Sequence, residues 1–308
     1  MLKTGPAAGI FWMCTATLIS SIQGGLVRSL AGQIPTLELV LVRNIAALLV
    51  LYPIVRRQGL ALPPPSQLPF YALRVLFAFG ATALLFVALA RMPIANVYAL
   101  QYLIPLFTIL LAVLLLKQKA DAHSWGACVV GFLGALVIIR PGIITFTLAA
   151  AAALSNAFLQ GGNNTVIKVL ARRDNPEVIT MWTNLAMVPL SLVPVAAFGQ
   201  WVTPTVTQWP VVLAIGFIGA FGGYCFTRAV SSADARIVQP FQFSRMIFAT
   251  GIGWIMFGEF PDLWTWIGAA VIFSASYYVV YREARTRRAA TAEDDMTDST
   301  DKDEKTAA

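Results

Sequence analysis

The sequence predicts an all-α membrane protein, and three observations lead to that prediction. The 308 residues are 58% hydrophobic and only 12% charged, whereas a soluble domain carries about 25% charged residues, and mean hydropathy is +0.72. The apolar residues form about ten blocks, and several reach the roughly 20 residues that cross a bilayer as a helix. The blocks do not alternate between apolar and polar residues, so they do not indicate barrel strands.

Short connectors rich in Pro, Gly or charge separate the blocks, and no connector is long enough to hold a soluble domain. The first block ends without a small-residue cleavage site, so we interpret it as a spanning helix and not as a signal peptide. In chain order, the sequence predicts helices at 6–29, 36–55, 69–90, 94–116, 123–140, 146–168, 178–199, 208–230, 234–257 and 263–281.

The helices divide into a first five-helix unit, 6–141, and a second, 146–281. The remaining residues, 282–308, are polar and charged. Such a segment buries too little apolar surface to offset the entropy lost on ordering, so we expect a disordered cytoplasmic tail.

Lys and Arg indicate the orientation of the helices. If the N-terminus is cytoplasmic, the outer connectors carry only Arg28, Arg91 and Arg140. The inner connectors then carry the cations Arg56, Arg57, Lys117, Lys119, Arg172, Arg173, Arg228 and Arg236. Because cytoplasmic loops are enriched in cations, we predict a bacterial inner-membrane protein with both termini inside. The net charge of +7 is dispersed over block ends and forms no patch for nucleic acid.

The second half repeats a pattern of the first. Residues 26–31 read LVRSLA and residues 166–171 read VIKVLA, 140 positions later, with Arg28 and Lys168 in the same place. The same offset places Gln23 on Asn163. Because each half has five helices, the second half enters the membrane from the opposite side. The pattern therefore predicts a 5+5 inverted-topology repeat, the architecture of many secondary transporters, with substrate bound between the halves.

Longer motifs carry a resemblance to a family. The stretch ALARMPIANVYALQYLIPLFTILLAVLLLKQKADAHSWGACVVGFLGALVIIRPG resembles the first EamA repeat of the drug/metabolite transporter superfamily, and RAVSSADARIVQPFQFSRMIFATGIGWIMFGEFPDLWTWIGA resembles the second. Within the family, IPLFT, VVGFLGALVIIRPG, QWVTP and GEFPD are most similar to S-adenosylmethionine uptake carriers. The resemblance covers about residues 8–281 and implies alternating access. The family often has an acid after its fourth helix, where this chain has Lys117, Gln118 and Lys119. The second half keeps that acid as Glu259, so any gating role would be confined to one half.

Polar side chains at mid-membrane depth are the candidates for a substrate site. An ionised group there costs about 2.5–3.5 kcal/mol, so Arg245 and Arg43 either face a cavity or make structural ion pairs. Arg74 lies nearer a block end, from which its side chain can extend to the interface. Amides at this depth line a cavity or bond between helices. The predicted substrate-binding set is Gln23, Arg43, Tyr98, Gln101, Tyr102, Asn156, Asn163, Trp182, Gln242 and Arg245.

These residue types suit a small zwitterionic or carboxylate-bearing metabolite. The cations would attract a carboxylate, the amides would orient it, and Tyr102 and Trp182 would contact a ring, with Tyr224 and Trp254 as further aromatic candidates. The resemblance implies uptake or exchange of S-adenosylmethionine, whereas riboflavin or amino-acid-type metabolites, imported or exported, fit the residues as well. No Asp or Glu lies deep in a block, which favours exchange or facilitated diffusion over proton coupling.

Other functional classes fit less well. His123 is the single histidine and lies in a connector, and the chain has no HExxH motif, so an intramembrane enzyme is not indicated. Cys14, Cys128 and Cys225 have no partner at metal-ligand spacing, and we expect neither a metal nor a cofactor. The alternative from another class is a membrane scaffold or receptor that transports nothing. The sequence does not fix the oligomeric state.

Overall fold

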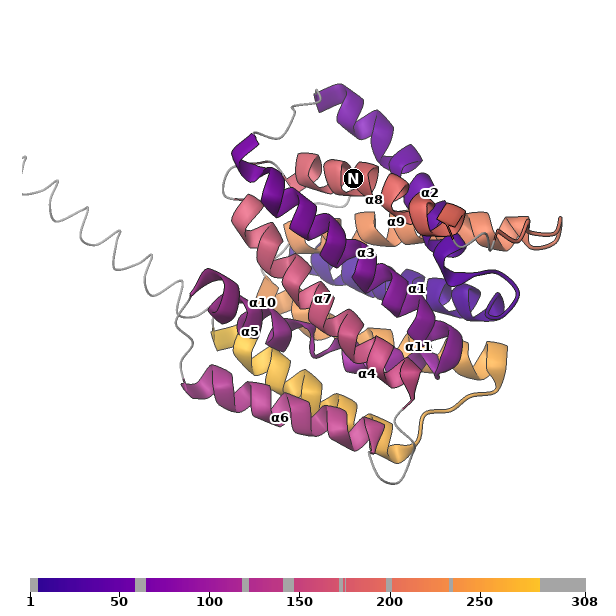
Figure 1. The fold of residues 1–308 in the computed structure, drawn as a ribbon. Helices are drawn as coiled ribbons and strands as arrows, with labels where there is room; N and C mark the ends of the chain where they lie inside the picture. Colours follow the sequence, from indigo (N-terminus) through magenta and orange to yellow (C-terminus); the bar gives the residue numbers. More distant parts are fainter. Residues whose placement is uncertain are drawn as a thin grey trace, which may run out of the picture.

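The structure is a computed structural model that describes residues 5–58, 65–117, 122–140, 147–171, 174, 176–197, 201–232 and 235–282. Every regular element within these ranges is helical, so the prediction of an all-α chain is confirmed (Figure 1). Apart from Arg282, the predicted tail lies outside the described residues.

The helices follow the predicted order. The first half contains α1 (Pro6–Ser29), α2 (Thr36–Gln58), the turn η1 (Pro65–Gln67), α3 (Leu68–Arg91), α4 (Ile94–Gln101), α5 (Ile104–Leu116) and α6 (Ala122–Ile139). The second half contains α7 (Leu148–Leu170), α8 (Pro176–Ala197), α9 (Trp209–Ser232), α10 (Ala235–Val238), η2 (Gln239–Phe243), α11 (Ser244–Phe257) and a last helix, Leu263–Arg282.

Many of these helices suit a bilayer. Six spans in the described residues are long and apolar enough to cross a membrane, and they belong to α1, η1 with α3, α4 with α5, α8, α9 and the last helix. Large apolar side chains such as Leu49, Leu114 and Ile255 are exposed on the helices. Because water disfavours such a surface and acyl chains accept it, the structure fits a membrane protein.

Each half contains one broken helix. The sequence predicts a continuous helix at 94–116, but Tyr102 and Leu103 form a turn between α4 and α5. Pro105 explains the break, because it has no amide hydrogen for the Gln101 carbonyl and its ring would clash with that carbonyl. In the second half, Pro240 lies in η2, between α10 and α11. This break agrees with the effect of proline, which interrupts helical hydrogen bonding.

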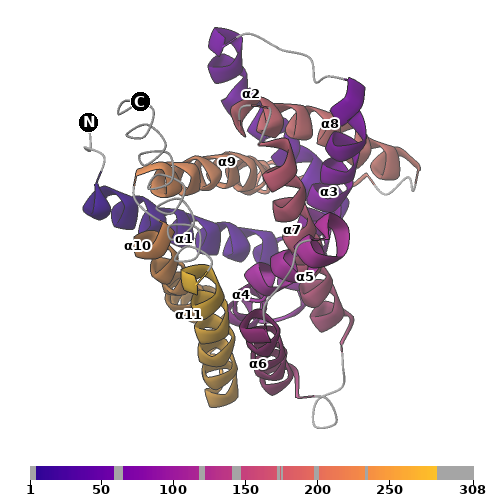
Figure 2. The same ribbon diagram turned by 90° about the vertical axis from the view of Figure 1, so that its left-hand side faces the viewer.

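The two halves of the chain interlock. Helix α1 packs along α9, and α3 packs along α7; α11 packs on α1, and α5 packs on α7. Figures 1 and 2 show α2 and α8 together on one side of the bundle, with α6 and the last helix together on the other. Helices of the first half begin again 140 to 142 positions later in the second half, as with Ile104 and Ser244 at the starts of α5 and α11.

Glycines allow two of these close approaches. A Cβ on Gly161 of α7 would lie 2.9 Å from backbone atoms of Phe107 and Thr108 in α5. A Cβ on Gly219 of α9 would overlap the side-chain amide of Gln23 from α1. Small residues at such contacts let helix backbones and polar groups approach within the bundle.

We predict that Gly161→Ala destabilises the protein by about 1–3 kcal/mol, because the new methyl group meets the α5 backbone, which cannot move aside as a side chain would. Gly251→Ala is the matched control, since a Cβ there meets nothing within 4 Å. That change should leave stability unchanged or raise it by up to about 1 kcal/mol through helix propensity. Thermal unfolding of the purified protein in detergent measures both effects, and equal melting temperatures for the two variants would contradict the prediction.

Candidate functional site

A cavity of about 450 Å³ lies where helices of both halves meet near their midpoints. Its lining comes from α1, α2, α3, α4, α5, α7, α9, α11, the turns at the two helix breaks and the last helix. A cavity of this size encloses a typical small metabolite. It is lined by eight of the ten residues predicted for the site, namely Gln23, Arg43, Tyr98, Gln101, Tyr102, Asn156, Gln242 and Arg245.

The other two predicted residues do not line this cavity. Asn163 is buried, but the face of α7 toward the cavity carries Asn156, Gln160 and Asn164 instead, at spacings of four residues. A helix period of 3.6 residues accommodates either asparagine on that face, and the packed rotation of α7 selects Asn164. Trp182 packs against a separate apolar cluster, formed by Tyr71, Val166, Leu170 and Ile179.

Two further aromatic candidates also lie away from the cavity. Trp254 is 64% exposed on α11, and Tyr224 is 41% exposed on α9, where its ring packs against Trp12 and Phe221. Both lie on exposed faces of their helices and do not line the cavity. The sequence pattern does not specify how the helices pack, so it could not show this.

A directional chain of hydrogen bonds holds Arg245 in the cavity. The Arg245 guanidinium donates to Gln101 Oε1 at 3.0 Å, Gln101 Nε2 donates to Asn156 Oδ1 at 3.1 Å, and Asn156 Nδ2 donates to the Ala81 carbonyl at 2.7 Å. A guanidinium can only donate and a carbonyl can only accept, so both amides have one allowed orientation. The chain joins α11, α4, α7 and α3, and thereby both halves.

The remaining surroundings of Arg245 are aromatic. Its guanidinium carbon lies 5.4 Å from the centroid of the Tyr98 ring, and the Tyr98 hydroxyl donates to the Ser20 carbonyl at 2.6 Å. The buried Nε of Arg245 has no hydrogen-bond partner among the described residues. Arg245 is therefore fixed in position and retains a donor for another group.

Arg43 supplies a second cation to the same cavity. Its guanidinium donates weakly to Asn44 Oδ1, at 3.4 Å. Glu38 is not its partner, because Glu38 is buried and accepts from the Val202 amide at 3.2 Å. No Asp, Glu or His is among the described residues that line the cavity, so its charged groups are both cations.

The two helix breaks place helix ends beside the cavity. Ile104 and Pro105, at the start of α5, and Arg245, at the start of α11, all line the cavity. The N-terminus of a helix carries partial positive charge and its C-terminus partial negative charge. Because α4 ends beside the start of α5, these backbone contributions oppose each other, and the positive charge of the cavity comes from Arg43 and Arg245.

Tyr102, Phe273 and Tyr277 form an aromatic wall of the cavity, and the sequence pattern did not single out the two that lie on the last helix. Tyr102 stacks on Phe243 with centroids 5.8 Å apart and meets Phe273 edge-on at 5.7 Å. Ser276 donates to the Tyr102 carbonyl, and Tyr277 stacks on Phe273. The available signal was the spacing of Phe273, Ser276, Tyr277 and Val280, which all line the cavity from one helix face.

Arg74 differs from its prediction. It is buried instead of extending to the interface, and it donates to the Ile179 carbonyl and the Thr183 hydroxyl of α8. These bonds give the Arg74 guanidinium two acceptors between α3 and α8, outside the cavity. Arg74 therefore has a structural position.

We predict that Asn156→Leu destabilises the protein by about 1–2 kcal/mol, because it removes the middle of the chain that ends at Arg245 and leaves the Gln101 amide unpaired. Asn164→Leu is the matched control on the same face of α7. Its side chain takes part in one long contact, with Gln160 at 3.5 Å, so its loss should stay within about 0.5 kcal/mol. Denaturant unfolding in detergent distinguishes the two, and a larger loss for Asn164→Leu would contradict the prediction.

Curated proteins related to this chain are named as transporters. A riboflavin transporter of Vibrio cholerae is 28% identical over 292 residues, which cover 93% of this chain and 97% of the relative. A pseudopaline exporter of Pseudomonas aeruginosa is 29% identical over 271 residues, covering 87% and 94%. An S-adenosylmethionine uptake transporter of Rickettsia prowazekii is 26% identical over 283 residues, covering 90% and 94%.

A solved structure, described only as the crystal structure of a protein, aligns with a TM-score of 0.60 at 21% identity, covering 90% of this chain and 95% of the other. At that identity the likeness concerns the fold alone. The EamA-like transporter family matches residues 7–140 and 147–281. With the relatives, this match confirms the prediction of a membrane transporter and not an enzyme. The chain belongs to the EamA-like transporter family.

Proposed function

We propose that the chain is a secondary transporter that moves a small metabolite across the bacterial inner membrane by alternating access. The observation that carries the proposal is the cavity at mid-bundle, built from both halves and lined by Arg43, Arg245 and several amides. A scaffold that transports nothing has no need for charged groups in such a place, because they are costly in a membrane interior.

We further propose that residues 6–141 and 146–281 form an inverted repeat with both termini cytoplasmic. The recurrence of helix starts after 140 to 142 positions supports this repeat. The reciprocal packing of α1 with α9 and of α3 with α7 also supports it, since a two-fold relation between the halves exchanges these two contacts. The excess of Lys and Arg on one side supports the orientation.

The proposed binding residues differ slightly from those that the sequence suggests. Arg43 and Arg245 attract negative charge or a carbonyl-rich edge, and Tyr102 with the aromatic wall contacts a ring. Orienting bonds come from the amides Gln23, Gln101, Asn156, Gln160, Asn164 and Gln242. Asn163 and Trp182 are left out because they do not line the cavity.

A ring-bearing metabolite without net positive charge fits these residues best, and we propose riboflavin as the first substrate to test. Its flat ring suits the wall of Tyr102 and Phe273, and its imide edge suits paired amides. S-adenosylmethionine, to which the sequence motifs pointed, carries a sulfonium and an ammonium group against one carboxylate. Its net positive charge is disfavoured next to two guanidinium groups. Named relatives transport each compound.

The transport mode that we propose is exchange or facilitated diffusion. A proton-coupled carrier usually relies on a buried carboxylate or histidine, and the described lining of the cavity offers Arg43 and Arg245 as its charged groups. Direction then follows the substrate gradient. Relatives named for uptake and for export both align with most of this chain.

Counterflow in proteoliposomes tests the proposal. Liposomes loaded with unlabelled riboflavin should accumulate labelled riboflavin saturably without an ion gradient. Parallel liposomes loaded with S-adenosylmethionine should accumulate their labelled compound more weakly. The reverse order would overturn the substrate, and accumulation only under an imposed proton gradient would overturn the mode. An absence of transport across a panel that includes amino acids would favour a non-transporting scaffold.

We predict that Arg245→Ala raises the KM of counterflow about tenfold, because a hydrogen bond to a charged group contributes about 1.5–3 kcal/mol. Arg91→Ala is the matched control, since Arg91 is exposed at the end of α3 and does not line the cavity. It should leave KM within about twofold. An unchanged KM in Arg245→Ala would remove Arg245 from the proposed site.

A further inference from the structure

The two ends of the cavity are closed to different extents. At one end α4 packs against α11. At the opposite end α10 and η2 pack on α1 and α5 packs on α7, but no comparable packing joins α5 to α10 or η2 in the described residues. Lining residues on the last helix also extend toward this second end, to Tyr277 and Val280.

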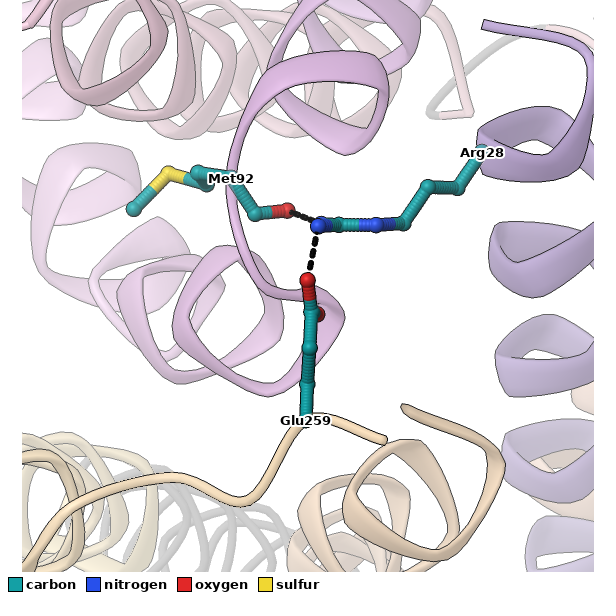
Figure 3. A network of polar contacts seen from close by, with 3 residues as sticks. All are labelled: Arg28, Met92 and Glu259. Carbon is teal, nitrogen blue, oxygen red and sulfur yellow. Dashed lines mark hydrogen bonds and ion pairs between the residues drawn. The ribbon is translucent and has the colours of Figure 1, made fainter. Parts of the chain in front are cut away.

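A cluster of polar contacts lies at the closed end. Arg28, near the C-terminus of α1, donates to the Glu259 carboxylate and to the Met92 carbonyl (Figure 3). Met92 follows α3, and Glu259 follows α11. The Arg28 guanidinium also lies 5.2 Å from the ring centroid of Phe257, the last residue of α11. One side chain therefore joins the ends of three helices from both halves.

This clamp, defined as Arg28, Met92 and Glu259, lies just beyond the cavity. Arg28 follows the lining residue Gln23 by five residues, which is about 7.5 Å along a helix axis. The Arg28 and Glu259 side chains are 16% and 29% exposed. A pair sheltered to this extent is screened less by water than a surface pair, so breaking it has a measurable cost.

No equivalent clamp is seen at the opposite end in the part of the chain that the structure describes. Lys168 occupies the position of Arg28 in the second half, but it is exposed and makes no ion pair with any described residue. The fourth helices end alike, with Lys117 after α5 and Gly258 after α11 both in the left-handed backbone region. Gln118 then stands where the second half has Glu259. An amide in that place carries no charge to attract a cation.

We propose that the clamp is a gate that closes the cavity on the outer face and makes the state open to the cytoplasm the resting state. Outward opening requires the junction of α3 and α4 to separate from the end of α11, and this breaks the contacts through which Arg28 joins Met92 to Glu259. Because the described residues of the cytoplasmic end offer no counterpart, we expect the two open states to differ in free energy. The assignment of the clamp to the outer face depends on the topology proposed above. The gate itself depends on the contacts among Arg28, Met92 and Glu259.

A second ion pair on the same loop provides a control. Arg140, after α6, pairs with Asp262 at the start of the last helix. These two helices already pack together, since a Cβ on Gly134 would lie 3.0 Å from the Gly268 carbonyl. The Arg140–Asp262 pair therefore stays within one side of the bundle and does not cross the gate. Asp262 also caps the helix at the Thr265 amide, a role that Asn fills equally well.

Cysteine accessibility tests the gate without any assay of transport. Thr82 lines the cavity, so Thr82→Cys serves as the reporter, with Cys14, Cys128 and Cys225 replaced by alanine. A membrane-impermeant thiol reagent is applied to right-side-out vesicles and to inverted vesicles. With the clamp intact, labelling should be slow from the outer face and fast from the cytoplasmic face.

Glu259→Gln should accelerate labelling from the outer face about tenfold, because it removes the charge that holds Arg28. Asp262→Asn should change the rate less than twofold. Glu259→Asp, which keeps the carboxylate that accepts from Arg28, should label more slowly from the outer face than Glu259→Gln. Slow labelling in Glu259→Asp shows that the charge, and not a loss of folding on substitution at this position, explains the result for Glu259→Gln.

The outcomes separate the gate from the proposed function. Equal rates in Glu259→Gln and Asp262→Asn, or fast outer labelling with the clamp intact, would overturn the gate. Acceleration only in inverted vesicles would keep the gate and overturn the proposed orientation. The expected labelling pattern without counterflow of any substrate would keep the gate and overturn the transport proposal.

Discussion

The guanidinium of Arg245 is the group that most constrains the centre of this bundle. A guanidinium in a membrane interior is stable only when hydrogen-bond acceptors or aromatic faces surround it. Here the Tyr98 ring and the chain from Gln101 through Asn156 to the Ala81 carbonyl meet that need. The chain takes one residue from each of four helices, so their relative positions and the orientation of both amides are fixed together.

The helix breaks place these groups at mid-depth. Pro105 ends the continuous hydrogen bonding of the fourth helix just where Tyr98, Gln101 and Tyr102 line the cavity. Because irregular backbone is tolerated in a membrane only where it is covered by protein or lines a cavity, both breaks point to the same functional region. Gly219 complements them by leaving space for Gln23, whose amide donates to the Ile215 carbonyl at 2.8 Å.

The packing of α1 on α9 is matched by that of α3 on α7, whereas the charges at the helix ends are not matched. Arg28 and Lys168 occupy corresponding positions, and among the described residues Arg28 pairs with an acid, Glu259, whereas Lys168 does not. A repeat with equal halves would favour its two open states equally. Unequal charges at the two ends make the two open states differ in free energy. One sequence difference can therefore determine the side to which the cavity preferentially opens.

The sequence by itself determined the order and approximate bounds of the apolar helical spans, because apolar block length and connector composition are local properties. It also identified eight lining residues, since charged and amide groups at mid-depth are rare. Only the tertiary structure chose Asn164 over Asn163, moved Trp182 into an apolar cluster and added the aromatic face of the last helix. Those choices depend on how each helix is rotated in the bundle, and that rotation is set by packing against neighbours far away in the sequence.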